Sequence, residues 1–258
     1  MDLGIRNRRA LVCASTRGLG YACAQALARE GCAVLINGHD RGRLDAAVDL
    51  LRATGAQVDG VLADLNQHEE RSRLLEAAGE IDILVNNNAG PPPGHYQKWQ
   101  TDDWYQALES NMLGAIALIQ GLVPGMCQRK FGRVVNITSA MVKSPRAPMG
   151  LSTAARSGLT AYCKGLSQEV VADNVTINNL LPERFNTDRQ RYMAQRMMQA
   201  SGITMEEAMR QIADTICAKR LGDPAEFGDT CAFLCSHQAG FMSGQNIQLD
   251  GGSYPGLI

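Results

Sequence analysis

A short apolar run followed directly by a glycine-rich turn is the feature that most constrains how this chain can fold. Residues 9–13 form the run, residues 14–20 (ASTRGLG) form the turn, and a helical pattern begins there and stops at Gly31. Glycines at such a turn let the backbone approach a pyrophosphate, and the helix start offers free N–H groups. A lone Gly-x-Gly also occurs in ordinary tight turns, but this one lies between a strand and a helix. The junction therefore predicts a dinucleotide-binding unit.

Short apolar segments and helical patterns alternate along the rest of the chain. Segments of strand length cover residues 33–36, 58–62, 81–85, 133–137, 175–181 and 246–249, and helical patterns cover residues 41–53, 104–126 and 152–172. Strands of about five residues alternating with helices predict a parallel sheet with helices on both faces. We expect one domain, residues 1–258, with a doubly wound, Rossmann-like α/β fold. Two short helices around residues 186–219 form an insertion that we interpret as a substrate lid.

Composition narrows the classes of function. Apolar residues make up 45% of the chain and charged residues 20%, and the formal net charge is −1. This is typical of a globular protein, whereas a nucleic-acid binder usually carries a basic surface. No apolar run approaches the ~20 residues that cross a bilayer, and the N-terminus lacks the pattern of a secretory signal. We therefore expect a cytoplasmic protein with a small-molecule substrate, which binds neither nucleic acid nor membrane.

The eight cysteines give no sign of disulfides or of a metal site. Most of them lie within apolar segments, no Cys-x-x-Cys pair exists, and the four histidines stand far from paired thiols. Such cysteines are typical of small buried side chains in a reducing compartment. We expect no bound metal.

Further motifs follow the glycine-rich turn in a fixed order. They are residues 87–90 (NNAG), 110–111 (SN), 136–139 (NITS), 243–246 (SGQN) and 249–252 (LDGG). Together with the turn, they resemble the motifs of the short-chain dehydrogenase/reductase family, especially its 3-oxoacyl-acyl-carrier-protein reductase-like branch. The resemblance covers essentially the whole chain and implies a nicotinamide-dependent oxidoreductase. One departure lies in the turn itself, where Ala14 replaces the first glycine of the family motif.

The resemblance implies a set of cofactor-binding residues spread over several strand ends. They are Ser15, Thr16, Arg17, Gly18, Leu19, Gly20, His39, Asp64, Leu65, Asn88, Ala89, Gly90, Arg156, Pro182 and Thr187. Asp64 has the alternative role of capping the helix that follows it.

The end of the second strand bears on the choice of cofactor. NAD-dependent members carry an acidic residue there, which binds the ribose 2′-hydroxyl. Gly38 occupies that position here and leaves space for a phosphate, while Arg17, with His39 or Arg41, offers a positive charge. Asp40 is out of place for the ribose and is suited to cap the next helix. We therefore expect NADP(H) rather than NAD(H).

The catalytic positions depart from the family pattern. Counting from Ser139 brings the family's Tyr-x-x-x-Lys to Ser152 and Arg156, and no shift of one or two residues restores it. In the family the tyrosine moves the substrate proton and the lysine lowers its pKa. A serine is far less acidic, and an arginine holds ribose hydroxyls without giving up its proton readily. We expect the catalytic set to be Asn111, Ser139, Ser152 and Arg156.

Several residues are expected at the rim of this site, each with a structural alternative. Three prolines at 91–93 form a stiff segment that can present His95 and Tyr96 to a substrate, or a plain surface loop. Glu183 replaces a family glycine and is either a base or an ion-pair partner of Arg184 or Arg189. Five methionines between residues 193 and 209 form either a mobile apolar lid or the packing of two helices.

Three functions stay open from the sequence. The first is an oxidoreductase acting on a carbonyl or a secondary alcohol, with the proton supplied by Ser152, by a water on Ser139, or by a rim group such as His95, Tyr96 or Tyr192. The second is a non-redox lyase, dehydratase or isomerase on the same scaffold. The third is an inactive protein that only binds a dinucleotide.

The resemblance also implies an assembly of several chains. The family pairs its two long helices, here residues 103–126 and 152–172, or its last helix and strand. Small or apolar residues are expected on the outward faces of the long helices, namely Ala107, Ala115, Leu118, Leu122, Ala154, Gly158 and Ala161. A helix that is apolar on most sides must be buried by something. We expect a homotetramer, with a dimer as the second choice.

Overall fold

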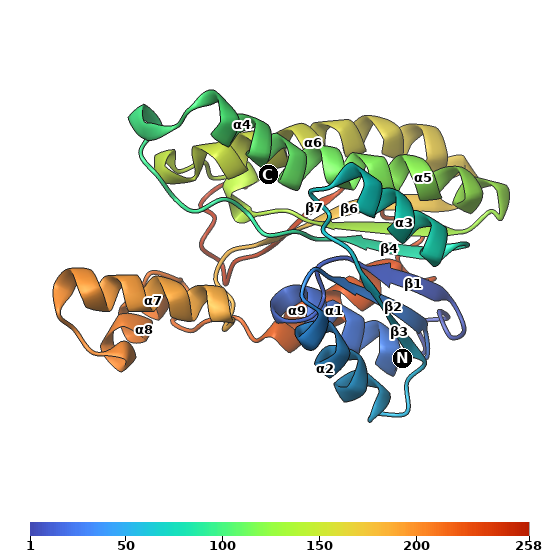
Figure 1. The fold of residues 1–258 in the computed structure, drawn as a ribbon, viewed down its shortest axis with the longest axis horizontal. Helices are drawn as coiled ribbons and strands as arrows, with labels where there is room; N and C mark the ends of the chain where they lie inside the picture. Colours follow the sequence, from blue (N-terminus) through green and yellow to red (C-terminus); the bar gives the residue numbers. More distant parts are fainter. Residues whose placement is uncertain (258) are drawn as a thin grey trace.

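Seven parallel strands form a single sheet in the order β3-β2-β1-β4-β5-β6-β7 (Figure 1). We describe residues 1–257, in a computed structural model. The strands are β1 Arg9–Val12, β2 Ala33–Gly38, β3 Val58–Leu62, β4 Ile83–Asn86, β5 Gly132–Ile137, β6 Val175–Pro182 and β7 Asn246–Leu249. The order reverses between β1 and β4, and open α/β sheets bind ligands at the carboxyl ends of the strands beside such a reversal. The predicted doubly wound sheet is confirmed.

Helices cover both faces of the sheet (Figure 1). The layer below the sheet in this view contains α1 (Gly18–Arg29), α2 (Arg41–Arg52) and α9 (Pro224–Cys235), and the layer above contains α3 (His68–Ala78), α4 (Thr101–Leu108), α5 (Gly114–Gln128) and α6 (Gly150–Val170). Each layer buries its own apolar cluster against the sheet. No apolar pattern in the sequence predicts α3, because most of its residues are polar or charged.

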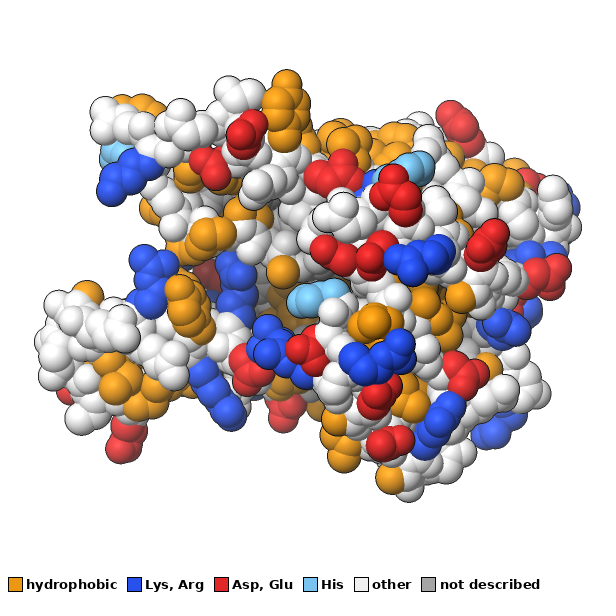
Figure 2. Space-filling model, viewed as in Figure 1, with side chains coloured by type: hydrophobic (Ala, Val, Ile, Leu, Met, Phe, Trp, Pro, Cys, Tyr) orange, Lys and Arg blue, Asp and Glu red, His pale blue; other side chains and the backbone are white. Residues whose placement is uncertain are grey.

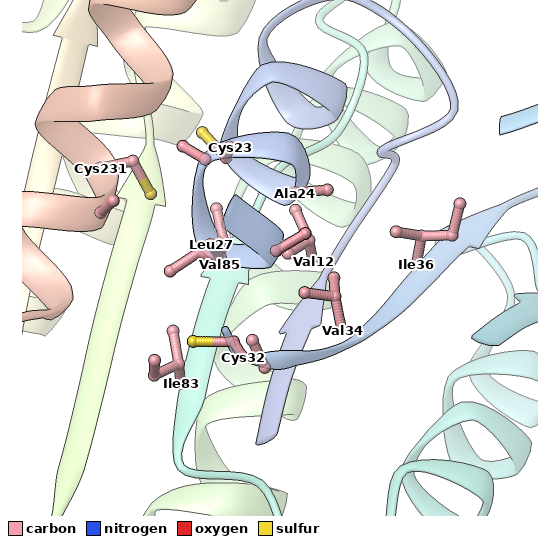
Figure 3. Packing of buried hydrophobic residues seen from close by; sticks show 14 of the residues in the cluster. Val12, Cys23, Ala24, Leu27, Cys32, Val34, Ile36, Ile83, Val85 and Cys231 are labelled. Carbon is pink, nitrogen blue, oxygen red and sulfur yellow. The ribbon is translucent and has the colours of Figure 1, made fainter. Parts of the chain in front are cut away.

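The cluster below the sheet shows how closely the helices pack. Figure 3 shows Cys23 of α1 and Cys231 of α9 lying near one another, above the apolar side chains of the first strands. A Cβ at Gly228 of α9 would lie 2.4 Å from the carbonyl oxygen of Ala22, so the two helices are in contact through backbone. Six of the eight cysteines are buried, as predicted, while Cys127 is half-buried and Cys217 is exposed.

A row of asparagine side chains joins four neighbouring strands, at the carboxyl ends of β4 and β5, in the middle of β6 and at the start of β7. The Nδ2 of Asn86 donates to Asn136 (2.9 Å), that of Asn136 to Asn179 (2.9 Å) and that of Asn179 to Asn246 (2.8 Å). The four residues are direct neighbours in the registers of β4 to β7. Because a buried amide is costly without partners, this row favours one register for the strand ends that carry the site.

The predicted long helix at residues 104–126 is interrupted. A π-helical turn, Glu109–Leu113, separates α4 from α5, and it turns Asn111 inward until only 4% of the residue is exposed. Such turns insert one extra residue and occur frequently at functional sites. Periodicity did not predict it, because one added residue shifts the apolar pattern by less than a third of a turn.

The same stretch corrects the expectation that no apolar run is long enough to cross a membrane. By length and composition alone, Thr101–Gln128 would suffice, with a mean hydropathy of 1.3 over its most apolar window. The α5 part of it contacts α3, β5 and α6. A core helix of a globular domain has the same features.

The prediction of which residues face outward on the long helices is partly wrong. Ala107 (1% exposed), Leu118 (1%) and Leu122 (6%) are buried within the single chain. They pack inward because this layer is covered by the sheet on one side and by neighbouring helices on the other. Ala154 and Ala161 of α6 are exposed, as predicted.

The insertion consists of α7 (Asp188–Ser201) and α8 (Met205–Asp214), which project from the body of the molecule (Figure 1). The pair has a small core of its own, around Ala194, Ala208 and Ile212, against which Met197, Met198, Met205 and Met209 pack. This packing favours the structural interpretation of these methionines. Backbone hydrogen bonds between Gly222 and residues 184 and 186, each 2.9 Å, hold the two ends of the insertion together.

Candidate active site at the carboxyl ends of the strands

The glycine-rich turn, residues 14–20, and the start of α1 form a concave surface above β1, which we call the cradle. A Cβ at Gly20 would lie 2.6 Å from the carbonyl oxygen of Ala14 and 2.8 Å from Nδ2 of Asn87, so no side chain fits there. Ala14 itself adopts a left-handed conformation (φ +43°), which costs a non-glycine residue about 1–2 kcal/mol. No side chain caps α1, and its first turn carries no acidic residue. The free helix start and the side-chain-free turn fit a bound pyrophosphate.

The end of β2 explains the glycine at the position of the family's acidic residue. A Cβ at Gly38 would lie 2.4 Å from Cγ2 of Thr16, so an acidic side chain there would clash with the turn. His39 is exposed beside it. Asp40 accepts a hydrogen bond from the backbone N–H of Arg43 (2.9 Å) and caps α2, as predicted.

Arg17 lies across the mouth of the cradle. Its guanidinium is 3.4 Å from the carboxylate of Asp188, at the start of α7, and both side chains are more than half exposed. An exposed ion pair of this kind is weak, so Arg17 can exchange Asp188 for a ligand phosphate at little cost.

The loop after β3 shows that the capping role expected for Asp64 is wrong. Asp64 accepts a hydrogen bond from the backbone N–H of Asn66 (2.9 Å), whereas α3 begins only after Gln67. Asp64 therefore does not cap that helix. The carbonyl of the next residue, Leu65, accepts from the nearly buried Arg71 (2.7 Å), which also pairs with Glu109 at the start of the π-helical turn.

The loop after β4 brings the predicted motifs together. Asn88 donates to the carbonyl of Ser110 (3.1 Å), and the carbonyl of Ala89 accepts from Nδ2 of Asn111 (2.9 Å). A Cβ at Gly90 would lie 3.3 Å from both Asn111 and Ser152. This close approach places the cofactor motif against the predicted catalytic residues.

Three of the predicted catalytic residues form one buried hydrogen-bond chain. Ser152 donates to Oδ1 of Asn111 (3.2 Å) and accepts from Nε of Arg156 (3.1 Å). The exposed fractions of Asn111, Ser152 and Arg156 are 4%, 6% and 8%. A serine has one proton to donate, and here that proton is directed to Asn111. In this arrangement Ser152 links its two neighbours and does not face an open site.

Arg156 is a buried cation without a carboxylate partner among residues 1–257. Its guanidinium also donates to the carbonyls of Ile137 (2.7 Å) and Asn88 (3.2 Å), so β5 and the loop after β4 both hold it. Burial, and to a smaller extent the nearby positive charge of Arg189, lower its pKa to about 10. Arg156 therefore stays protonated at neutral pH.

A small cavity of about 20 Å³ lies beside Asn111 and Arg156, which is enough for one water. Asn86 lines it, and its Oδ1 is buried without a hydrogen-bond partner. That orphaned acceptor is suited to hold such a water.

Ser139 is placed differently from Ser152. It lies two residues after the end of β5, is half-buried and accepts from the backbone N–H of Met141 (3.2 Å), while no residue among 1–257 accepts its hydroxyl proton. Pro182 ends β6 and Thr187 precedes α7, both half-buried. Ser139 thus retains a free donor.

The rim holds aromatic residues and one ion pair. His95 and Tyr96 are exposed and stack at 4.9 Å, while Trp99 packs against Gly94 and Gly150 and so joins the proline segment to the start of α6. Glu183, with a side chain 10% exposed, is 3.0 Å from Arg146. The same carboxylate is 3.9 Å from Nε of Arg184, one of the two predicted partners. These contacts favour the predicted ion-pair role, and Arg146 is a further partner that no sequence pattern indicates.

No group of three or more His, Cys, Asp or Glu that could hold a metal ion occurs among residues 1–257.

Comparison with known proteins agrees with this geometry. The sequence model of a family described as "Enoyl-(Acyl carrier protein) reductase" matches residues 13–254. The chain is 30% identical over 258 residues to the uncharacterized oxidoreductase YvaG of Bacillus subtilis, with 98% of each protein covered. It is 31% identical over 254 residues to dehydrogenase/reductase SDR family member 4 of Bos taurus, covering 96% of this chain and 87% of the relative.

Solved structures show the same relationship. L-sorbose reductase from Gluconobacter frateurii, complexed with NADPH and L-sorbose, superimposes with a TM-score of 0.96 at 27% identity, and both chains are covered fully. YwfH, an NADPH-dependent reductase involved in bacilysin biosynthesis, gives 0.92 at 27% identity, with 97% of this chain and 100% of that chain covered. Together with its fold and its cofactor cradle, these matches show that the chain belongs to the short-chain dehydrogenase/reductase family.

Proposed function

We propose that this protein is an NADP(H)-dependent oxidoreductase that interconverts a carbonyl and a secondary alcohol. The observation that carries the proposal is the cradle above β1, where Gly20 leaves no room for a side chain and the start of α1 is uncapped. The uncapped start of α1 leaves backbone N–H groups that the phosphates of a dinucleotide would satisfy. Relatives described as NADPH-dependent reductases support the assignment.

NADP(H) is favoured over NAD(H) by the end of β2. Gly38 packs against Thr16, so a side chain at position 38 would require Thr16 to move, and the glycine offers no carboxylate to the 2′-hydroxyl. Arg17, with the exposed His39 or Arg41, provides positive charge for a 2′-phosphate. Ser15, Leu19, Asp64, Leu65, Asn88 and Ala89 would complete the binding of the nucleotide.

The remaining residues are assigned by their hydrogen bonds. The nicotinamide supplies the hydride chemistry when it is bound. Ser139 has a free hydroxyl with which to polarise the substrate carbonyl. Arg156 has unused donors that would hold the nicotinamide ribose, and Thr187 and Pro182 would face the carboxamide. Asn111 and Ser152 position Arg156.

In this assignment, the roles of the family's tyrosine and lysine pass to different groups. Ser152 occupies the tyrosine position, but its proton is directed to Asn111, so we assign the substrate proton to a water on Ser139 or to a rim residue. Arg156 occupies the lysine position and provides a fixed positive charge. Such a charge stabilises an oxygen that becomes negative during reduction.

Reduction of a carbon–carbon double bond conjugated to a carbonyl is the second candidate. The matched family is described as an enoyl reductase, and hydride addition to the distal carbon leaves an enolate that needs no immediate proton on oxygen. A site with a fixed cation and no acidic hydroxyl fits this reaction.

The assembly is also proposed. Phe241 is fully exposed, and Phe233, on the outer side of α9, is 38% exposed. These residues favour an interface at the last helix and strand, as one of the two that a homotetramer needs. Light scattering at micromolar concentration is expected to give the mass of four chains, and the mass of one chain would contradict the proposal.

The activity is tested with NADPH and two substrate panels, ketones and aldehydes in one and conjugated enones in the other. We expect NADPH oxidation with the carbonyl panel and a loss of at least about tenfold in kcat/KM in Ser139→Ala. Turnover of enones alone would select the second candidate. Conversion without NADPH oxidation would indicate a non-redox enzyme. Binding of NADPH without any conversion would indicate a dinucleotide-binding protein, and either outcome would overturn the proposal.

The linking role of Ser152 is tested by its effect on stability. Ser152→Ala leaves Nε of Arg156 and Oδ1 of Asn111 buried without this partner, which costs about 1–3 kcal/mol of unfolding free energy. Urea denaturation measures this loss. Ser157→Ala on the same helix is the control, because Ser157 is half-buried outside this chain of hydrogen bonds, and it should change stability by less than about 0.5 kcal/mol. Equal stability of both variants would refute the role.

A further inference from the structure

Positive charge gathers around the open side of the candidate active site. Figure 2 shows a hollow between the α7–α8 pair and the body of the molecule, with Lys and Arg side chains on both of its walls. Four arginines lie on different segments around the site: Arg146 on the loop before α6, Arg156 on α6, Arg184 on the loop after β6, and Arg189 on the first turn of α7.

One carboxylate serves two of these arginines. Oε1 of Glu183 is 3.0 Å from Arg146 and 3.9 Å from Arg184. One negative charge therefore balances only one of the two positive charges. Nε of Arg184 is buried without a hydrogen-bond partner. Glu183 therefore satisfies neither the full charge nor all the hydrogen-bond donors of the two arginines.

The other two arginines have no acidic partner. Neither Arg156 nor Arg189 takes part in an ion pair within residues 1–257. The start of α7, which carries Arg189, lies beside the glycine-rich turn: Asp188 is 3.4 Å from Arg17, and a Cβ at Gly18 would lie 3.9 Å from Thr187. From there the charge of Arg189 lowers the pKa of the buried Arg156. Two like charges beside a largely buried site are unfavourable unless an anion lies between or beside them. Within residues 1–257, no carboxylate pairs with either of them.

We propose that the substrate is an anionic carbonyl compound, whose carboxylate or phosphate ester is received by Arg189 and Arg146 at the mouth of the cleft. A guanidinium binds either group through two parallel hydrogen bonds, which fixes the orientation of the substrate. The carbonyl part of this inference rests on the proposed function, whereas the anion site does not.

Glu183 has a defined part in this arrangement. Its carboxylate competes with the substrate anion for Arg146. Removing that charge releases Arg146 for the ligand. The inference therefore predicts that Glu183→Gln strengthens the binding of an anionic substrate, which a base acting in catalysis would not do.

The test compares carbonyl compounds with and without an anionic group on a similar skeleton. The probes are 2-oxobutanoate and 4-oxopentanoate, each against its methyl ester, and dihydroxyacetone phosphate against dihydroxyacetone, with NADPH as reductant. We expect kcat/KM to favour at least one anion over its neutral partner by about tenfold or more. Arg189→Gln and Arg146→Gln should each reduce that ratio several-fold, and Glu183→Gln should lower KM for the anion.

Arg191→Gln is the matched control. Arg191 lies on the same helix, exposed and about 200° around the axis from Arg189, so it faces away from the site. It should leave the ratio unchanged. No preference for any anion, or a preference that survives in the Arg146→Gln/Arg189→Gln double variant, would overturn the inference while leaving the proposed function intact.

Two further measurements separate the possible failures. If no probe is reduced, the proposed function fails, and calorimetry of the same anions with the NADP⁺-loaded protein tests the anion site alone. Binding that the arginine variants weaken at least fivefold upholds the anion site. No binding of any anion overturns the anion site as well. If Arg189→Gln weakens NADPH binding and leaves the anion ratio unchanged, the arginine serves the cofactor pyrophosphate and the inference is wrong.

Discussion

The hydrogen bonds of one buried guanidinium hold the candidate site together. Arg156 donates to Ser152 on its own helix, to the carbonyl of Ile137 on β5 and to the carbonyl of Asn88 after β4. Through Ser152 it also reaches Asn111 on the π-helical turn. Four segments that are distant in the sequence therefore meet at one charged group, and losing it would leave several buried polar atoms without partners.

This arrangement accounts for the small side chain at position 152. The hydroxyl of a serine reaches only its immediate neighbours, and at this depth those are Asn111 and Arg156. A fixed cation supported in this way suits the stabilisation of negative charge, and the proposed function assigns proton delivery to other groups. Ser139, whose hydroxyl proton has no acceptor among residues 1–257, and the small cavity beside Asn86 are the places where water can serve that purpose.

The features predictable from the sequence were those set by local patterns. The alternation of strands and helices predicted the parallel sheet, and the bare turn at Gly18 and Gly20 predicted the cradle. Counting along the family motif placed Ser152 and Arg156 on one helix turn, where they do meet. The π-helical turn escaped prediction, because it changes the helical phase by one residue only. The pairing of Glu183 with Arg146 also escaped, since no pattern connects two loops that lie 37 residues apart.

Burial was harder to predict than secondary structure. Leu118 and Leu122 were assigned to an outer face, but a helix between a sheet and two other helices needs apolar residues on more than one side. The methionines of α7 and α8 were open to two interpretations for a similar reason. Helical spacing identifies the apolar face, and only the tertiary structure identifies what covers it.

The dependence of kcat/KM on pH tests most directly whether a permanently charged Arg156 supports the reaction. In the wild type, we expect no loss of activity on the alkaline side until near pH 10, because the pKa of Arg156 is about 10. In Arg156→Lys that loss should move down by at least about one pH unit, since burial lowers the pKa of a lysine below its usual value of about 10.4. An alkaline loss at the same pH in both proteins, below about pH 9, would contradict the account, because another group would then control the reaction.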